Sequence, residues 1–247
     1  GNHAIIGTEG YPYFRLSGDG AQVFFMTDQG FSVSGQNYAA GLYAVSWSGG
    51  APRAIVTKNQ VAAYYGVNPD DFVHFTAGTE VYFDVSHDGS RLVFGTRVSN
   101  GGARLMRVNG DGSGLAEYPL PQDYYLYIYN VALSGNGSKV VYLAQRTPCC
   151  SAPYELKALN WDGSGSATQL SAYGGPNTNS ARIQLTSDGA RVNYLGTLYN
   201  TDGNGRLELA IRGPFNPSDP PSLVNDYGLY GGSMSSGGTR FLYGADY

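Results

Sequence analysis

Hydrophobic and polar positions follow one pattern that returns five times along the chain. Each copy has an apolar residue, a small polar pair, an Asp, Asn or Gly, then a Gly, two polar residues and an apolar run. The copies recur about every 49 residues, with one longer interval after the first. They read LSGDGAQVFFM (16–26), VSHDGSRLVFG (85–95), LSGNGSKVVYL (133–143), LTSDGARVNYL (185–195) and MSSGGTRFLYG (234–244).

This pattern predicts β-hairpins. An Asp-Gly or Asn-Gly pair lets the backbone adopt a positive φ and reverse direction between two strands. The Ser or Thr that precedes the pair hydrogen-bonds the turn backbone. We therefore predict hairpins near 13–26, 81–96, 128–144, 182–196 and 229–244.

A second strand–turn–strand motif follows the hairpins, so each complete repeat has four antiparallel strands, A to D. The motif reads LYAVSWSGGAPRAIV (42–56), RLMRVNGDGSGLAEYPL (104–120) and ELKALNWDGSGSATQL (155–170). In the fourth repeat, RLELAIR (206–212) is expected to be strand C, with GPFNPSDPPS after it in place of the short turn.

Four-stranded repeats of about 40 to 50 residues are the unit of a β-propeller. We predict an all-β fold, a single propeller domain over residues 1–247 with five four-stranded blades. Residues 58–80 are treated as an insertion, in which Asn68 and Pro69 have the residue types of a helix start.

The motifs also resemble a known family, the TolB-like β-propeller repeat, which is a relative of WD repeats. The resemblance rests on the S-x-D-G hairpin followed by the N-x-D-G-S-G turn, and covers about residues 12 to 244. The family typically has Pro before the Asp-Gly pair. This chain instead has Gly18, His87, Gly135, Ser187 and Ser236 there.

The two ends of the chain are expected to close the ring. NHAIIGT (2–8) is similar to PRAIVTK (52–58), which is strand D of the first repeat. The closing strands would contain Ala4, Ile5 and Ile6 at one end and Phe241, Leu242 and Tyr243 at the other. By this count one strand is missing. A three-stranded last blade, a strand from a partner, a trimmed chain and a fragment of a larger ring all remain open.

Composition narrows the function classes. The chain has 36 Gly and 21 Tyr, with only 14% charged residues, which argues against helical bundles and against disorder. Its net charge of −4 makes nucleic acid an unexpected partner. No apolar run reaches the roughly 18 residues of a membrane span.

Loop lengths predict a binding face. The A–B and C–D turns are expected on one face of the propeller. The longer B–C loops (28–41, 145–153, 197–205) and D–A loops (58–80, 121–127, 172–180) are expected on the other. Tyrosine suits interfaces, although it also packs between blades. The candidate face contains Tyr38, Tyr64, Tyr65, Asp70, Asp71, Tyr124, Tyr125, Tyr173 and Tyr199.

Candidate chemistry is sparse. Cys149 and Cys150 are adjacent, which fits either a vicinal disulfide in an oxidising compartment or two free thiols. The three histidines are scattered and no catalytic motif is found. Asn200, Asp202 and Asn204 alternate as calcium ligands do, although a Gly-rich turn explains the same spacing.

These features predict a non-catalytic interaction scaffold without a resident cofactor, calcium being the one candidate. We expect it to be secreted, at the cell surface or periplasmic. It would bind a protein partner, or copies of itself, through the long-loop face or an incomplete blade edge. A lectin-like carbohydrate-binding propeller and the propeller domain of a hydrolase are the alternatives.

Overall fold

The computed structural model describes most of the repeat region. The described residues are 13–69, 75, 83–98, 102–120, 127–145, 154–173, 183–194, 197–208, 233–234, 237 and 241–242.

Four antiparallel sheets of four strands make up this structure, and we call each a blade. Blade 1 contains β1 (Tyr13–Leu16), β2 (Gln22–Thr27), β5 (Gly41–Ser46) and β6 (Arg53–Thr57). Blade 2 contains β7 (Phe83–Val85), β8 (Arg91–Val98), β9 (Gly102–Asn109) and β10 (Ala116–Glu117). Blade 3 contains β11 (Tyr127–Leu133), β12 (Lys139–Gln145), β13 (Tyr154–Asn160) and β14 (Thr168–Tyr173). Blade 4 contains β15 (Gln184–Leu185), β16 (Arg191–Tyr194), β17 (Thr197–Asn200) and β18 (Arg206–Glu208).

Three further elements complete the described chain. A two-stranded sheet pairs β19 (Ser233–Met234) with β20 (Phe241–Leu242). We label it blade 5 because it follows blade 4 along the chain. The hairpin of β3 (Phe31–Val33) and β4 (Gln36–Tyr38) lies between strands B and C of blade 1. Helix α1 (Lys58–Tyr65) follows strand D of the same blade. The all-β, antiparallel prediction is confirmed.

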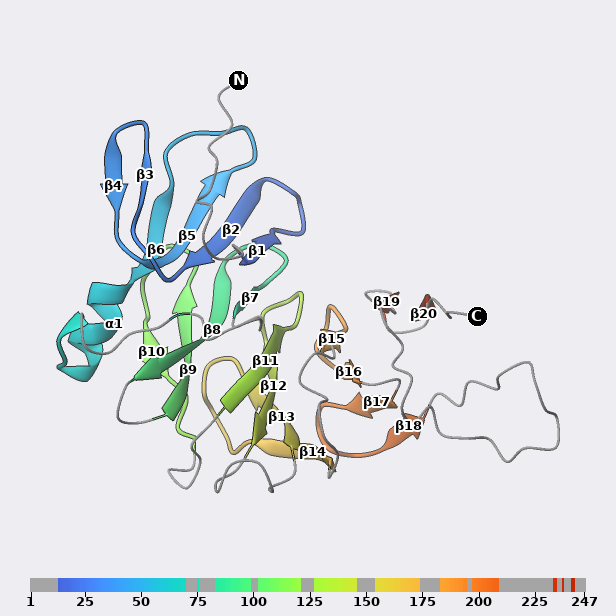
Figure 1. Ribbon diagram of the computed structural model, residues 1–247. Helices are drawn as coiled ribbons and strands as arrows, with labels where there is room; N and C mark the ends of the chain where they lie inside the picture. The colour runs from blue at the N-terminus through green and yellow to red at the C-terminus, as the bar shows by residue number, and fades with distance from the viewer. Residues whose placement is uncertain are drawn as a thin grey trace, which may run out of the picture.

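The blades follow one another around an arc in chain order, with strand A of each blade toward the middle (Figure 1). The first strands are neighbours: β1 contacts β7, β7 contacts β11, β11 contacts β15 and β15 contacts β19. Ala4, Ile5 and Ile6, which were expected to close the ring, lie outside the described residues.

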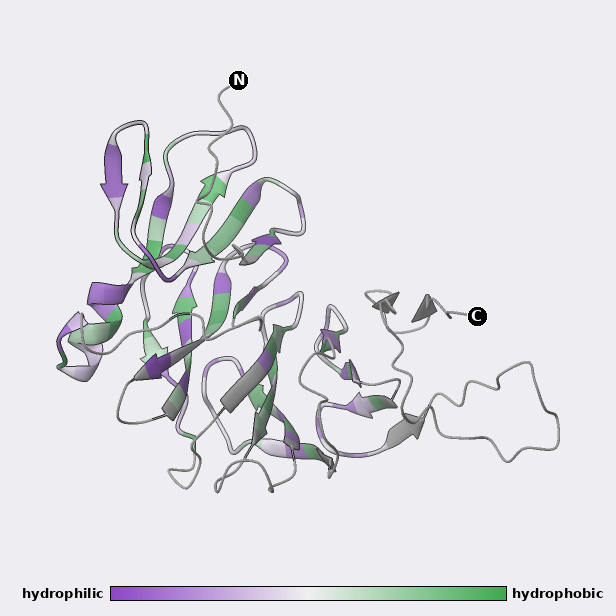
Figure 2. Ribbon diagram, in the orientation of Figure 1, coloured by the Kyte–Doolittle hydropathy of each residue, from purple (hydrophilic) through white to green (hydrophobic). Residues whose placement is uncertain are grey.

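Hydrophobic cores fill the spaces between successive blades. One core joins blades 1 and 2 around Phe24 and Phe94, and another joins blades 2 and 3 around Leu105 and Tyr142. A third joins blades 3 and 4 around Val141. Hydrophobic residues are concentrated on strands such as β2, whereas β4 and the start of α1 are hydrophilic (Figure 2). Burial on both faces explains why the central strands have nearly continuous apolar runs.

In blades 1 to 4, each A–B turn is a closed network built by the repeated sequence motif. In blade 1 the Ser17 hydroxyl donates to Asp19 Oδ1 (2.6 Å), and Asp19 Oδ1 accepts the Ala21 amide (2.9 Å). Ser17 Oγ also accepts the Gln22 amide (2.9 Å), while Gly20 takes the left-handed conformation at φ 70°. The same hydroxyl-to-oxygen bond recurs in Ser86–Asp88 (2.6 Å), Ser134–Asn136 (2.8 Å) and Thr186–Asp188 (2.6 Å).

Backbone hydrogen bonds join these turns from one blade to the next. The Gly18 amide donates to His87 O (2.6 Å), and the His87 amide donates to Gly135 O (2.7 Å). The Asn136 amide then donates to Ser187 O (2.7 Å). We call this series the turn ladder. Two of its donors lie where the TolB-like family typically has Pro, which has no amide hydrogen and could not donate.

Side-chain hydrogen bonds also connect the A strands of neighbouring blades, next to the turn ladder. Asp84 on β7 accepts the Arg15 guanidinium of blade 1 through Oδ1 (3.1 Å). Its Oδ2 accepts the Leu133 amide of blade 3 (2.8 Å). One carboxylate thus bridges three blades.

The strand assignment of the fourth repeat was wrong. Residues 197–205, expected to be a B–C loop, form strand C (β17) and a short C–D turn. Residues 206–208, expected to begin strand C, form strand D (β18). The four-residue strand TLYN follows Gly196, ends in Asn200 and is followed by a Gly-rich turn, so this stretch resembles a loop in composition. All four C–D turns are therefore short.

We predict that low pH destabilises the fold by protonating the Asp side chains of the A–B turns. Hydrogen bonds from the Ser86 hydroxyl and the Ser90 amide hold the pKa of Asp88 below its usual range. Such a group stabilises the fold above its unfolded pKa, about 3.9, and this contribution is lost as the pH falls through the folded pKa. Asp88→Asn, which copies Asn136 of blade 3, should change the unfolding free energy at pH 7 by less than about 1 kcal/mol.

The same variant should lose less stability than wild type between about pH 5 and pH 2, measured by urea unfolding across the pH range. Ser86→Ala is the contrasting variant. It should destabilise at every pH, since it also removes the acceptor of the Arg91 amide. If Asp88→Asn lost as much unfolding free energy as wild type between pH 5 and pH 2, this carboxylate would not contribute to the pH dependence.

Candidate functional site

The two ends of the blades differ in construction. At one end each C–D turn donates a backbone hydrogen bond to the A–B turn of its own blade, so both kinds of turn share a face. The bonds are Trp47 N to Ala21 O (2.8 Å), Gly110 N to Ser90 O (2.7 Å), Trp161 N to Ser138 O (2.9 Å) and Thr201 N to Ala190 O (3.0 Å).

At the other end of blade 1, two longer connections emerge together. Thr27, Gly41 and Thr57 lie in one row across strands B, C and D, so residues 28–40 and the segment after Thr57 leave from the same edge. Asp28 Oδ1 accepts the Phe75 amide (2.5 Å), which ties the two connections together. We call this end of the blades the long-loop face.

The first connection, which was predicted only as a long B–C loop, contains the β3–β4 hairpin. Tyr38 stacks on Phe31 with ring centroids 4.9 Å apart, and both rings pack edge-on against Tyr43. Phe25 joins this cluster, stacked on Tyr43 at 5.6 Å. Tyr38 therefore packs its ring on blade 1.

The second connection is helix α1. Thr57 and Gln60 form a capping box at its start, and Gly66 ends it in the left-handed conformation at φ 66°. The sequence prediction of a helix start near Asn68 and Pro69 missed α1. Backbone at Pro69 is helical, and the residues directly after it lie outside the described part.

Helix α1 anchors two tyrosines of the candidate face. The Tyr65 hydroxyl donates to Glu117 Oε2 (2.9 Å), and Glu117 also pairs with Arg104 (3.4 Å). Burial and the Glu117 carboxylate raise the pKa of Tyr65, so its hydroxyl remains a donor. The Tyr64 hydroxyl accepts the Glu117 amide (3.3 Å), while 48% of the Tyr64 residue surface is exposed. Tyr64 thus offers a fixed aromatic ring to solvent.

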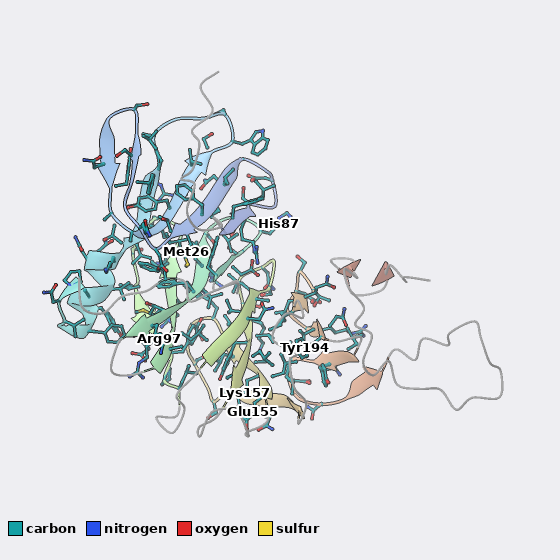
Figure 3. The ribbon with its side chains drawn as sticks, viewed as in Figure 1. Met26, His87, Arg97, Glu155, Lys157 and Tyr194 are labelled. Carbon is teal, nitrogen blue, oxygen red and sulfur yellow. The ribbon has the colours of Figure 1, made fainter. Side chains whose placement is uncertain are left out.

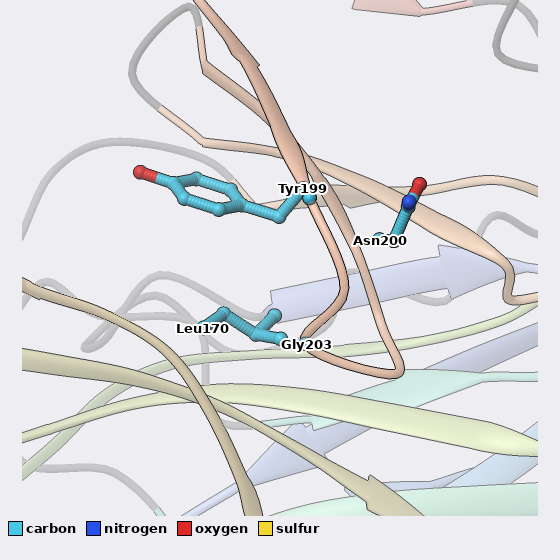
Figure 4. A pocket seen from close by; sticks show the side chains of 5 residues that line it. Leu170, Tyr199, Asn200 and Gly203 are labelled. Carbon is cyan, nitrogen blue, oxygen red and sulfur yellow. The ribbon is translucent and has the colours of Figure 1, made fainter.

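Tyr199 does not belong to the candidate face. It was predicted in a loop, but it lies in β17 and is buried in the core between blades 3 and 4. Beside it is a cavity of about 240 Å³, lined by Leu170, Asn200, Gly203 and Gly205 as well as Tyr199 (Figure 4). It lies between the outer strand of blade 3 and the C–D turn of blade 4.

The candidate calcium residues form a turn of the repeated type. Asp202 Oδ1 accepts the Asn204 amide (2.8 Å), as Asp111 accepts that of Ser113 (2.9 Å). Asn200 Nδ2 donates to Asn204 O (2.5 Å). Among the described residues no three His, Cys, Asp or Glu side chains lie close enough to hold a metal ion. Calcium binding stays a prediction.

Several predicted residues cannot be placed in the site. Tyr173 is the last residue of β14, and Phe241 and Leu242 form β20. The remaining ones lie outside the described residues: Asp70, Asp71, Tyr124, Tyr125, Cys149, Cys150 and Tyr243. Within the described ranges, no helix has the length and apolar character needed to cross a bilayer.

Solved structures share this fold. A putative TolB from Agrobacterium tumefaciens is 15% identical at a TM-score of 0.50, over 82% of this chain and 62% of its own. A chain from a study of two prolyl endopeptidases is 14% identical at a TM-score of 0.51, over 83% of this chain and 29% of its own. The chain has the fold of a TolB-like β-propeller.

The likeness extends to the fold alone. TolB from Acinetobacter baumannii is 12% identical at a TM-score of 0.45, over 78% of this chain and 41% of its own. No family model and no curated protein sequence matches the chain. The chain spans less than two thirds of the length of each of these three solved chains.

A buried ion pair lies inside blade 3 of the propeller, and the sequence analysis did not single it out. Lys157 Nζ is 2.8 Å from Glu155 Oε2, with less than a tenth of either side chain exposed (Figure 3). Lys157 is opposite Tyr142 and Glu155 is opposite Ala144, two residues of the core between blades 2 and 3. Alternation within ELKALN places both charges on one side of β13.

We predict that breaking this pair destabilises the propeller strongly. Lys157→Met should lower the unfolding free energy by about 3–5 kcal/mol, since it leaves the Glu155 carboxylate buried without its ammonium partner. Glu155→Leu combined with Lys157→Met removes both charges and should recover most of the loss. Urea unfolding of the single and double variants measures both effects. Equal stability of the two variants would contradict a buried-charge penalty.

Proposed function

We propose that this propeller is a non-catalytic interaction scaffold that binds a protein partner through its long-loop face. The edge of β20 in blade 5 is the second contact we propose for a partner or another copy of the chain. The scaffold would act outside the cytoplasm, in keeping with the adjacent Cys149 and Cys150.

The difference between the two ends of the blades is the observation that carries this proposal. One end is built from short turns that are locked to one another by backbone hydrogen bonds. The opposite end of blade 1 carries a hairpin and a capped helix that present additional side chains. Loops held by a rigid scaffold are the usual place for binding sites.

The exposed ring of Tyr64 fits a protein interface better than the buried aromatic residues do. Its hydroxyl is already bonded to the Glu117 amide, so binding a partner would cost little further loss of side-chain freedom. Tyrosine offers a large contact area with few rotatable bonds and is enriched at interface cores.

The solved relatives do not favour an enzyme over a scaffold. A putative TolB and a chain from a study of prolyl endopeptidases share this fold at identities of 15% and 14%. A fold does not determine a function, because function depends on the residues of a site. The hydrolase alternative therefore rests on fold alone.

Site-specific photocrosslinking tests the proposal. We expect a benzophenone side chain at position 64 to form protein adducts in an extract of the source organism, or with the purified chain if copies associate. The matched control carries the same group at Ser166, an exposed position in a C–D turn of the opposite face. Adducts at 166 but not at 64, or at neither position, would contradict binding at the long-loop face.

A further inference from the structure

Asn-Gly pairs lie at three turns of the described chain, and each pair has the residues for one spontaneous reaction. In this reaction the backbone nitrogen of the glycine attacks Cγ of the asparagine, and the side-chain amide leaves as ammonia. The succinimide ring that results takes up one water molecule and opens to aspartate or isoaspartate. Glycine favours the attack because it has no side chain to shield its nitrogen. The pairs are Asn109-Gly110, Asn136-Gly137 and Asn204-Gly205, and a fourth, Asn100-Gly101, lies outside the described residues.

The glycine amides of the first two pairs are held in hydrogen bonds. The Gly110 amide donates to Ser90 O (2.7 Å), and the Gly137 amide donates to Ser134 O (2.8 Å). An amide nitrogen must give up its proton to attack a carbonyl carbon, so each of these bonds has to break before the reaction can begin.

The asparagine side chains of the same two pairs are held as well. Asn136 Oδ1 accepts the Ser138 amide (3.0 Å), and its Nδ2 donates to Asp188 O in the next blade (3.0 Å). Asn109 Nδ2 donates to Ser113 Oγ (2.9 Å). Turning either Cγ toward its glycine nitrogen would break these bonds. Both pairs should therefore react only after the local structure has opened.

The third pair lacks both restraints. Asn204 is exposed, and among the described residues neither its side-chain amide nor the Gly205 amide nitrogen makes a hydrogen bond. Gly205 also lines the cavity beside Tyr199, so there is open space next to the bond that would react (Figure 4).

We propose that Asn204 is a modification site, which the folded chain converts to aspartate or isoaspartate with water as the only co-reactant. The turn does not require asparagine at this position. Ser113 and Ser164 occupy it in the matching turns of blades 2 and 3, and serine cannot form the succinimide. This inference is independent of the proposed function.

The modification would loosen the outer hairpin of blade 4. The Asn200 amide donates to Gly205 O (3.2 Å), and Tyr199 pairs with Arg206 directly after it. Isoaspartate routes the backbone through the side-chain carbon and so lengthens the chain within this turn, which would disturb both contacts. Either product also places a second carboxylate close to Asp202. The reaction would thus add negative charge as the protein ages and weaken the pairing of β17 with β18.

Peptide mass mapping of the full chain, kept folded at mildly alkaline pH, tests the proposal. We expect conversion at Asn204 while Asn109 and Asn136 stay intact over the same period. The chain unfolded in guanidinium chloride is the reference. There the three pairs should convert at similar rates, because the same two residues react in each, so the preference for Asn204 should appear only in the folded protein.

Labelling by an isoaspartyl methyltransferase, measured on the peptide that contains position 204, gives a second readout. Asn204→Ser, which copies blades 2 and 3, should retain the fold and abolish this labelling. The matched control Asn136→Asp, which copies Asp88 and Asp188, should leave it unchanged.

Three results would overturn the proposal. The first is conversion of Asn109 or Asn136 in the folded chain as fast as that of Asn204. The second is the same preference for Asn204 in the unfolded chain. The third is an unchanged Asn204 in the folded chain after a period that converts the unfolded one.

Discussion

The turn ladder is the interaction on which the arrangement of the blades depends. Three backbone hydrogen bonds of 2.6 to 2.7 Å connect the A–B turns of four successive blades. The hydrophobic cores between blades are not directional, so they favour contact without setting the register. The hydrogen bonds of the ladder are directional, so they determine how the A–B turns of neighbouring blades are positioned against each other. Gly18 fits this contact because a side chain there would overlap His87, whose Cδ2 lies 1.8 Å from an ideal Cβ.

The ladder requires turns of one shape, and the repeated sequence motif supplies it. The Ser or Thr hydroxyl bonds the Asp or Asn side chain, and this side-chain oxygen accepts an amide two residues later. The turn is thereby closed from within before it meets its neighbour. Since the C–D turns bond the same A–B turns, one face of the propeller has little freedom to vary. Additional structure is left to the opposite face, where the β3–β4 hairpin and α1 are found.

Much of the fold could be predicted from sequence because the determinants are local. The Asp-Gly and Asn-Gly turns and the apolar runs after them indicate hairpins without any knowledge of contacts. The third strand of blade 4 was missed because TLYN is short and lies between glycines. The turn motif NTDGNG, which matches NWDGSG in blade 3, is the signal that could have located it. The Ser34-Gly35 pair is a similar sequence signal for the β3–β4 hairpin, and the structure gives both residues a positive φ.

The candidate site was less predictable because its features depend on contacts distant in sequence. Tyr64 and Tyr65 were named as candidates, but their attachment to Glu117 joins segments more than fifty residues apart. Tyr199 was assigned to the site because residues 197–205 were predicted to be a loop, and it is instead a core residue. The pairing of Glu155 with Lys157 follows strand alternation, but the burial of the pair depends on how blade 3 packs against blade 2.

Hydrogen exchange of individual amides tests the role of the turn ladder most directly. Gly18, His87 and Asn136 are surface residues of turns, so their amides would exchange quickly if the turns were joined only by nearby packing. If the ladder holds the blades together, these three amides should exchange only through global unfolding, as slowly as the amide of Val93 in β8. Exchange as fast as that of the exposed turn residue Ser166 would contradict the account.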